Sequence, residues 1–323
     1  MTYASIKGTG GYLPERVVTN AELERLVDTS DRWIQERTGI RERRIVGEDQ
    51  TCCDLAVIAA SRALDAAGMK PSDIDLVTLG TCTPDRVFPS TACLVQRELG
   101  ITPGAVAFDV GAACSGFVFA LDVANRFILT GGARRALVIG AETMSRIIDW
   151  TDRGTCVLFG DGAGALVLEA DDTPGILSTH LHTDGSFEDL LNVPWGVSQG
   201  YDKLEGSAGK LKMRGNEVFR VAVRTLGRIV DETLEANGLN KRDVDWLIPH
   251  QANIRIIQAT AKKLGLPMDR VVQTVAEHGN TSAASIPLAL DTAVRDGRIK
   301  RGELLLLEAF GGGFTWGSAL IRY

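Results

Sequence analysis

The sequence contains an internal repeat that limits the folds open to the chain. Leu64–Leu76 (LDAAGMKPSDIDL) is matched 170 residues later by Leu234–Trp246 (LEANGLNKRDVDW), with Leu, Ala, Gly and two Asp at equal places. Shorter matches follow in the same order, between Ala120-Leu121-Asp122 and Ala289-Leu290-Asp291, and between the apolar runs Leu137–Gly140 and Leu304–Leu307. A helix-strand-helix-strand plan used twice predicts an α/β protein made of two similar halves.

The repeat also predicts how the chain is divided. Asp171-Asp172-Thr173-Pro174-Gly175 has the composition of a linker, so we expect an N-terminal half over 1–174 and a C-terminal half over 175–323. In the first half we expect a long helix over Leu55–Ala67, ended by Gly68, and a strand over Leu76–Gly80. The strands read as apolar on both faces, so two halves side by side would share a central helical layer.

Composition excludes several classes of protein. The chain of 323 residues is 45% hydrophobic and 24% charged, with a net charge of −6, which suits a globular core and argues weakly against nucleic acid as a partner. The N-terminus lacks the pattern of a signal peptide, and no apolar run is long enough to span a membrane. The six cysteines form no C-x-x-C pair and have no histidine at metal-ligand spacing, so we expect a reduced, cytoplasmic protein.

One cysteine lies where a nucleophile could be held. Ala112-Ala113-Cys114-Ser115-Gly116 joins the strand-like segment Ala105–Val110 to the helix-like segment Phe117–Leu129. Unpaired N–H groups and the dipole at the start of a helix favour negative charge, so we expect a lowered pKa and an available thiolate at Cys114. The alternative is a buried structural cysteine, since free cysteine is among the most buried residue types.

Three loops of the second half hold further polar or small residues at strand ends, where α/β sheets bind ligands. They are Pro249-His250-Gln251-Ala252-Asn253, Glu277–Ser282 and Ala309–Gly317. With Cys114, His250 and Asn280 fit either a hydrolase, with His as base and Asn orienting it, or a carbon–carbon bond-forming enzyme, in which both donate to one carbonyl oxygen. Their positions on separate loops favour the second. The glycine run 311–313 between two aromatics indicates a close approach of backbone to a ligand.

Two basic surfaces have both functional and ordinary interpretations. Trp33 and Arg37 are four residues apart and lie on one face of a helix. In the functional interpretation, Trp33 stacks on an adenine and Arg37 pairs with a phosphate. In the ordinary interpretation, Trp33 is packed against the protein and Arg37 is solvated. In the helix after His250, Arg255 and Lys262 share a face with Lys263 beside them. This face either docks an acidic partner or is simply solvated.

At these residues the chain resembles the 3-ketoacyl-acyl carrier protein synthase III family of the thiolase superfamily. The resemblance covers essentially the whole chain, and its segments are specific as a set: Asp28–Ile34, Ala112–Gly116, Phe159–Gly164, His250–Asn253, His278–Ser282 and Phe310–Gly317. It implies a thiolase-like fold, with two duplicated halves in a layered αβαβα arrangement, and a homodimer.

The resemblance implies a decarboxylative Claisen condensation that starts type II fatty-acid synthesis. Cys114 would attack an acyl-CoA and become acylated, and His250 and Asn280 would then stabilise the enolate formed from malonyl-acyl carrier protein as CO₂ leaves. The backbone N–H groups of Cys114 and Gly312 would form an oxyanion hole. Phe310 would shape the pocket, and Phe88 would close it around a short primer, which favours acetyl-CoA. No metal or other cofactor is implied.

The same resemblance implies the binding residues. Trp33 and Arg153 would sandwich the CoA adenine, Arg37 would bind phosphate, and Gly215 and Asn253 would line the pantetheine tunnel. The acidic carrier protein would dock on basic residues of the second half, namely Arg255, Lys262, Lys263 and Arg214.

Other functions stay open at this point. A related synthase could condense other acyl or aroyl thioesters in secondary metabolism. A degradative thiolase is disfavoured because it needs a second cysteine near the C-terminus, and none follows Cys156. A Cys-His hydrolase lacks further support. A non-catalytic carrier-protein-binding module would not need an intact set of Cys114, His250 and Asn280.

Overall fold

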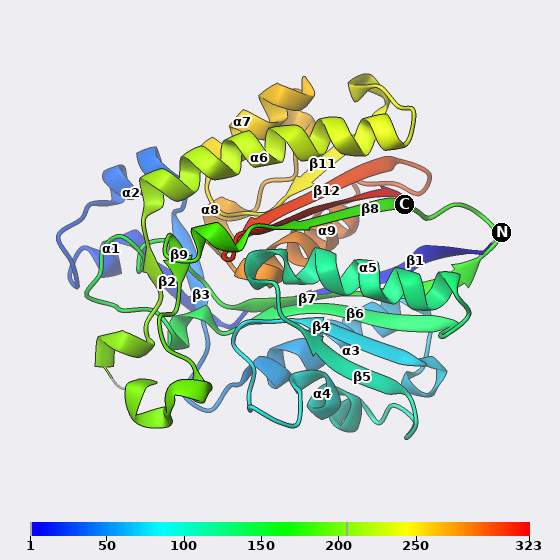
Figure 1. The fold of residues 1–323 in the computed structure, drawn as a ribbon, viewed down its shortest axis with the longest axis horizontal. Coiled ribbons are helices and arrows are strands. Elements are labelled where there is room, and N and C mark those ends of the chain that lie inside the picture. Colours follow the sequence, from blue (N-terminus) through cyan, green and yellow to red (C-terminus); the bar gives the residue numbers. More distant parts are fainter. Residues whose placement is uncertain (1, 205) are drawn as a thin grey trace.

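Two β-sheets alternate with three layers of helices in the computed structural model, which describes residues 2–204 and 206–323 (Figure 1). The order of the layers is α, β, α, β, α, as the resemblance implied. The two ends of the chain lie near one another at one side of the molecule.

Each sheet is built almost entirely from one half of the sequence. The strands of the first sheet are β1 (Tyr3–Tyr12), β4 (Leu76–Gly80), β5 (Val106–Val110), β6 (Arg135–Glu142) and β7 (Gly162–Asp171). They lie in the order β1-β7-β6-β4-β5. Strand β4 is parallel to β5 and β6, and β7 is antiparallel to both of its neighbours. The second has the order β11-β12-β13-β8 with only β11 and β12 parallel; its strands are β8 (Ile176–Thr183), β11 (Trp246–Pro249), β12 (Leu304–Gly311) and β13 (Thr315–Arg322). The change of sheet falls between Asp171 and Ile176, which supports the proposed division at 174/175.

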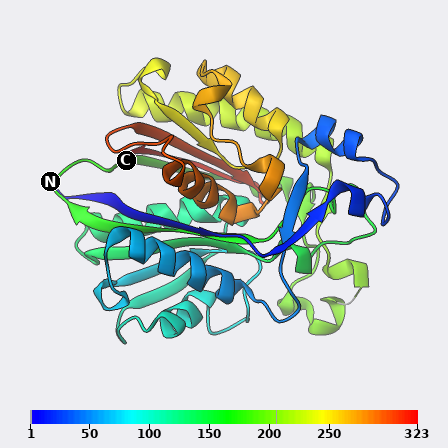
Figure 2. The same cartoon turned by 180° about the vertical axis from the view of Figure 1, so that it is seen from behind.

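Helices cover both sheets and fill the space between them (Figure 2). The middle layer consists of α5 (Gly116–Leu129) and α9 (Ser285–Arg295), whose apolar side chains face both sheets and form the central core. The outer layers consist of α3 (Cys52–Ala67) and α4 (Thr91–Leu99) on the first sheet, and of α6 (Gly215–Ala236) and α7 (Ile254–Leu264) on the second. Within the described residues, none of the helices is long and apolar enough to cross a membrane.

The repeat extends to the details of the backbone. Asp73 and Asp243, at equal places, accept hydrogen bonds from the backbone N–H groups of Lys70 (2.9 Å) and Asn240 (2.7 Å), and so fix the turn that follows each helix. Short 3-10 turns, Ala113–Ser115 and Ser282–Ala284, precede α5 and α9. Their first residues, Ala113 and Ser282, both take the left-handed conformation, with φ of 45° and 49°. The two halves therefore place two sharp turns in equivalent positions.

The remaining elements lie at one end of the two sheets. They are β2 (Arg16–Thr19), α1 (Asn20–Leu23), α2 (Asp31–Thr38), β3 (Glu42–Ile45), β9 (Leu191–Asn192), β10 (Lys212–Met213) and α8 (Val275–His278). Ser30 caps α2 by accepting a hydrogen bond from the Trp33 N–H at 3.2 Å, which fixes the start of that helix. Parts of this end form the mouth of the pocket described next.

Candidate active site

Cys114 lies in a sharp turn between β5 and α5, with the strand and the helix that the sequence predicted on either side. The turn packs against the end of β12, where a glycine is required. A Cβ on Gly311 would lie 2.7 Å from the Cys114 backbone nitrogen, closer than real Cβ contacts come. The glycine run therefore approaches the backbone of the cysteine itself, and Gly312 lines the pocket beside it.

The prediction of a lowered pKa for Cys114 is wrong. Cys114 is only 8% exposed, and burial raises the pKa of its thiol to about 11, assisted by the negative charge of Glu142. A hydrogen bond between Cys114 and Ser282 acts in the opposite direction and lowers this pKa. The loss of water around the sulfur outweighs the favourable position at the start of a helix.

His250 comes from the end of β11 and is fixed by Ser285 of α9. Its Nδ1 lies 2.6 Å from the Ser285 hydroxyl, which also accepts the Gln251 N–H at 3.3 Å. Since Ser285 keeps its own hydrogen to donate, this arrangement favours the tautomer with the proton on Nε2. Burial lowers the pKa of His250 to about 4, so the ring is neutral at pH 7. A neutral Nε2–H can donate to an oxygen in the pocket.

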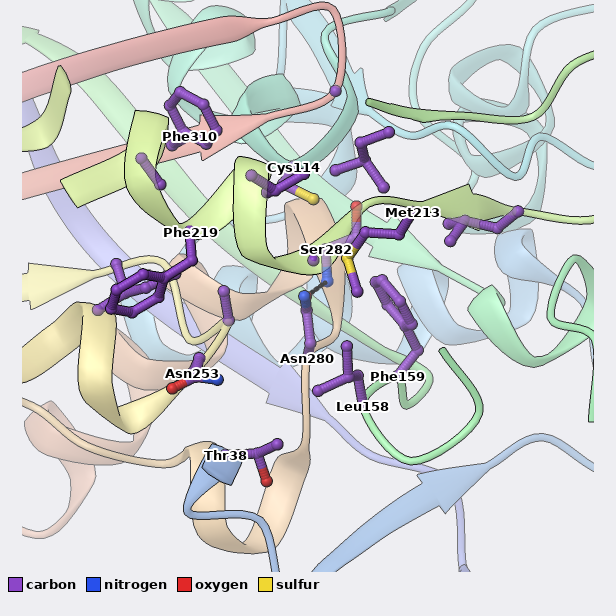
Figure 3. A pocket seen from close by; sticks show the side chains of 18 of the residues that line it. Thr38, Cys114, Leu158, Phe159, Met213, Phe219, Asn253, Asn280, Ser282 and Phe310 are labelled. Atoms are coloured by element: carbon purple, nitrogen blue, oxygen red, sulfur yellow. Dashed lines mark hydrogen bonds between the residues drawn. The ribbon is translucent and has the colours of Figure 1, made fainter. Parts of the chain in front are cut away.

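Asn280 is oriented by the backbone of its own turn. Its side-chain oxygen accepts the Ser282 N–H at 2.9 Å, and its backbone is held by hydrogen bonds to Leu158 and Gly160. The amide NH₂ is therefore left as the group that can donate into the pocket. Figure 3 shows Cys114, Asn280 and Ser282 turned toward the same space.

One cavity of about 500 Å³ joins these side chains. Cys114, His250, Asn280, Phe310 and Gly312 line its inner part. Most of the remaining lining is apolar, from residues such as Met144, Leu191, Met213, Phe219 and Leu226. The ring of Phe310 packs against Phe314 with centroids 4.6 Å apart, which holds it at the wall of the cavity.

The mouth of the same cavity carries most of the residues expected to bind CoA. Trp33, Arg37, Gly215 and Asn253 all line it. Asn253 also caps α7 by accepting the Arg255 N–H at 2.8 Å, and it donates to the Arg37 carbonyl at 2.9 Å. Its side chain is therefore held rigidly where the cavity opens.

Arg153 lies beside the cavity and closes the space expected for an adenine. Its guanidinium lies over the Trp33 ring, 4.9 Å from the centroid, and it donates to the Asp28 carbonyl at 2.6 Å. Arg37 lies over the same ring at 5.9 Å. A base could enter between Trp33 and Arg153 only if the arginine moved aside.

Phe88, which was predicted to close the acyl pocket, does not reach the cavity of its own chain, and its role stays a prediction. Its side chain is 83% exposed, in the loop before α4, and it does not line the cavity. A loop position cannot be located from sequence, because nothing in the local pattern sets its direction.

The basic residues expected to dock a partner are exposed on one side of the second half. Arg255 lies over the Phe219 ring at 5.0 Å, Lys263 pairs with Asp231 at 2.6 Å, and Arg214 pairs with Asp189 at 3.2 Å. Lys262 is exposed on α7. Sequence reasoning missed the exposed arginines of the neighbouring α6, whose spacing of four along one face could have revealed them: Arg220, Arg224 and Arg228.

Sequence reasoning also missed three residues that surround the nucleophile candidate. Ser285 orients His250, Ser282 hydrogen-bonds to Cys114, and Glu142 accepts the Ser282 hydroxyl at 3.0 Å. The repeat could have pointed to Ser282, since it occupies the place of Ala113 in the second half. Across residues 2–204 and 206–323 no group of three or more His, Cys, Asp or Glu is arranged to hold a metal ion.

The chain is similar over its whole length to known proteins. The family model described as 3-oxoacyl-(acyl-carrier-protein) synthase III matches residues 108–185, and the model of its C-terminal part matches residues 234–323. The beta-ketoacyl-(acyl-carrier-protein) synthase III of Alkalilimnicola ehrlichii is 71% identical over the full length of both chains. That of Xanthomonas campestris pv. campestris is 64% identical over 99% of this chain and 98% of the relative.

Solved structures agree with this result. The crystal structure of 3-oxoacyl-(acyl-carrier-protein) synthase III from Aquifex aeolicus is 48% identical, with a TM-score of 0.93 over 99% of this chain and 100% of that one. The priming beta-ketosynthase of the R1128 polyketide pathway is 39% identical, with the same TM-score over 99% and 96%. These identities extend over the whole chain, and the chain belongs to the 3-oxoacyl-(acyl-carrier-protein) synthase III family.

Proposed function

We propose that the chain is an acyltransferase that condenses a short acyl-CoA with malonyl-acyl carrier protein and so starts fatty-acid synthesis. The products are 3-ketoacyl-acyl carrier protein, CoA and CO₂. The observation that carries this proposal is the convergence of Cys114, His250 and Asn280 at the inner end of one cavity whose mouth carries Trp33 and Arg37. Relatives named for this synthase activity match the chain from end to end.

The geometry supports separate roles for the three side chains. Cys114 attacks the thioester and carries the acyl group, and the N–H groups of Cys114 and Gly312 hold the oxygen of the tetrahedral intermediate. The neutral His250 Nε2–H and the Asn280 amide then donate to the malonyl thioester oxygen, which gains negative charge as CO₂ leaves. Two donors fixed before the reaction lower its barrier without reorganisation.

The two substrates are proposed to bind on adjoining surfaces that share Arg255. CoA enters past Trp33, Arg37, Gly215 and Asn253, with Arg153 moving to admit the adenine. An acidic carrier protein docks on the basic face formed by Arg255, Lys262, Lys263 and Arg214, extended by the exposed arginines of α6. We further propose a cytoplasmic homodimer that needs neither a metal nor another cofactor.

A panel of acyl-CoA primers tests the proposal and its limits. Acetyl, branched, medium-chain and aroyl thioesters are each incubated with the protein and malonyl-carrier protein, and both the protein and the products are analysed by mass spectrometry. Condensation with acetyl-CoA supports fatty-acid initiation. Strong preference for an aroyl or longer primer supports instead a priming role in secondary metabolism, which the 39% identity to a polyketide priming ketosynthase keeps open. No acylation with any primer contradicts both.

A further inference from the structure

A buried carboxylate, Glu142, lies beside Ser282 close to the proposed nucleophile. Glu142, at the end of β6, is fully buried and accepts hydrogen bonds at one oxygen from Ser282 (3.0 Å) and at the other from Thr83 (2.6 Å). The Cys82 backbone N–H donates to it at 3.1 Å. The roles proposed above for the condensation leave this carboxylate unused.

Ser282 connects this carboxylate to the nucleophile. Its hydroxyl donates to Glu142 Oε1 at 3.0 Å and forms a hydrogen bond with Cys114, and Figure 3 shows both side chains turned toward the same space. A hydroxyl has a single hydrogen, so while it donates to Glu142 it can only accept from the thiol. The result is a directed chain, from the Cys114 S–H to the Ser282 oxygen and from the Ser282 O–H to Glu142. Ser282 itself takes the left-handed conformation, with a φ of 49°.

We propose that Glu142, acting through Ser282, accepts the proton of Cys114 as its sulfur attacks the acyl thioester. The S–H bond breaks while the sulfur–carbon bond forms, the thiol proton passes to Ser282, and the Ser282 proton passes to Glu142 Oε1. When the intermediate collapses, the bond from carbon to the CoA sulfur breaks. The proton then leaves with CoA as its thiol, and Glu142 is again a carboxylate. Acyl-CoA and thiol thus become acyl-cysteine and CoA, with every proton accounted for.

The surroundings of Glu142 suit this exchange. Burial raises the pKa of its carboxyl, which makes it a better proton acceptor than an exposed glutamate. The titratable groups that face it are Cys82, from the loop after β4, Cys52, from α3, and Cys114 through Ser282. Burial raises the pKa of the Cys52 thiol well above the ordinary range, and the Cys82 S–H donates to Glu142 Oε1 at 3.2 Å, so this oxygen already receives one thiol donor besides Ser282.

The inference rests on the proposed nucleophile, and its test separates the two. Alkylation of Cys114 by iodoacetamide is followed by peptide mass spectrometry between pH 5.5 and 9.5 in the wild type, E142Q, S282A and the double variant. Ala113 already adopts the same backbone conformation as Ser282, so alanine suits position 282. A matched control is C52A, which changes a buried side chain near Glu142 outside both the proton path and the cavity.

We expect E142Q and S282A each to slow alkylation of Cys114 at pH 7 by about 10²-fold, the lower end of general-base effects. The double variant should be no slower than either single one, since both break the same path. C52A should react at the wild-type rate. If Glu142 acts only as a nearby negative charge, removing that charge favours the thiolate, so an equal or faster rate in E142Q overturns the inference. If E142Q does not fold, S282A alone decides. Absence of labelling at Cys114 in the wild type refutes the proposed nucleophile instead.

Discussion

Glu308 should make the chain less stable as the pH rises. This residue of β12 is fully buried, and a hydrogen bond with Thr260 offsets only part of the cost of burying its charge. Burial raises the pKa of Glu308 from 4.5 to about 8, so between these values the folded chain holds a proton that the unfolded chain has lost. The favourable contribution is complete below pH 4.5 and is lost as the pH rises toward 8. At about 1.4 kcal/mol per pH unit, the loss between pH 5 and pH 8 is about 3 kcal/mol.

Urea unfolding at pH 5, 6, 7 and 8 measures this effect in the wild type and in Glu308→Gln. The glutamine has nearly the same shape but cannot ionise, so its cost as a buried amide is the same at each pH. We expect the free energy of unfolding of the wild type to fall by about 3 kcal/mol more than that of the variant over this range. Glu235→Gln, an exposed position on α6, serves as the control and should parallel the wild type. Parallel profiles for the wild type and Glu308→Gln would refute the reasoning.

Three further predictions concern the proposed active site. Gly311→Ala should abolish acylation of Cys114, measured by mass spectrometry, since its Cβ would lie 2.7 Å from the Cys114 nitrogen; normal acylation would show that the turn can move. Decarboxylation of malonyl-carrier protein should not change between pH 5.5 and 8, because burial keeps the pKa of His250 near 4, and His250→Ala should lower its rate by about 10²–10³-fold; a rate that follows an ionisation near pH 6.5 contradicts this. Lys262→Glu with Arg220→Glu should raise the KM for carrier protein about tenfold and leave that for acyl-CoA unchanged, since neither residue lines the cavity; equal effects on both substrates would place docking elsewhere.

The duplicated fold could be predicted from the sequence because each copy of the repeat covers the end of a helix, the turn after it and the start of the next strand. The strand predicted over Leu76–Gly80 is found with the same bounds, and Gly68 ends the preceding helix as expected. That helix begins at Cys52 and not at Leu55, because Thr51 and Asp54 form its capping box. Capping side chains decide where such a helix begins, and the spacing of apolar residues contains no information about them.

The candidate site could be predicted only in part. Cys114, His250 and Asn280 each follow a recognisable strand or turn, so their positions could be inferred from where strands end. The pKa of Cys114 depends on how completely the fold excludes water, which no local pattern contains. Glu142 was missed for a related reason, since its partner Ser282 lies 140 positions further along the chain and only the fold brings the two together. The position of Phe88 likewise depends on the course of a loop.

The central claim is that Cys114 carries the acyl group. Incubation with acetyl-CoA in the absence of malonyl-carrier protein, followed by peptide mass spectrometry, tests it directly. We predict one acetyl group per chain, on the peptide that contains Cys114, and none on Cys114→Ala. An acetyl group on any of the other five cysteines, or acylation that survives in Cys114→Ala, would contradict the account.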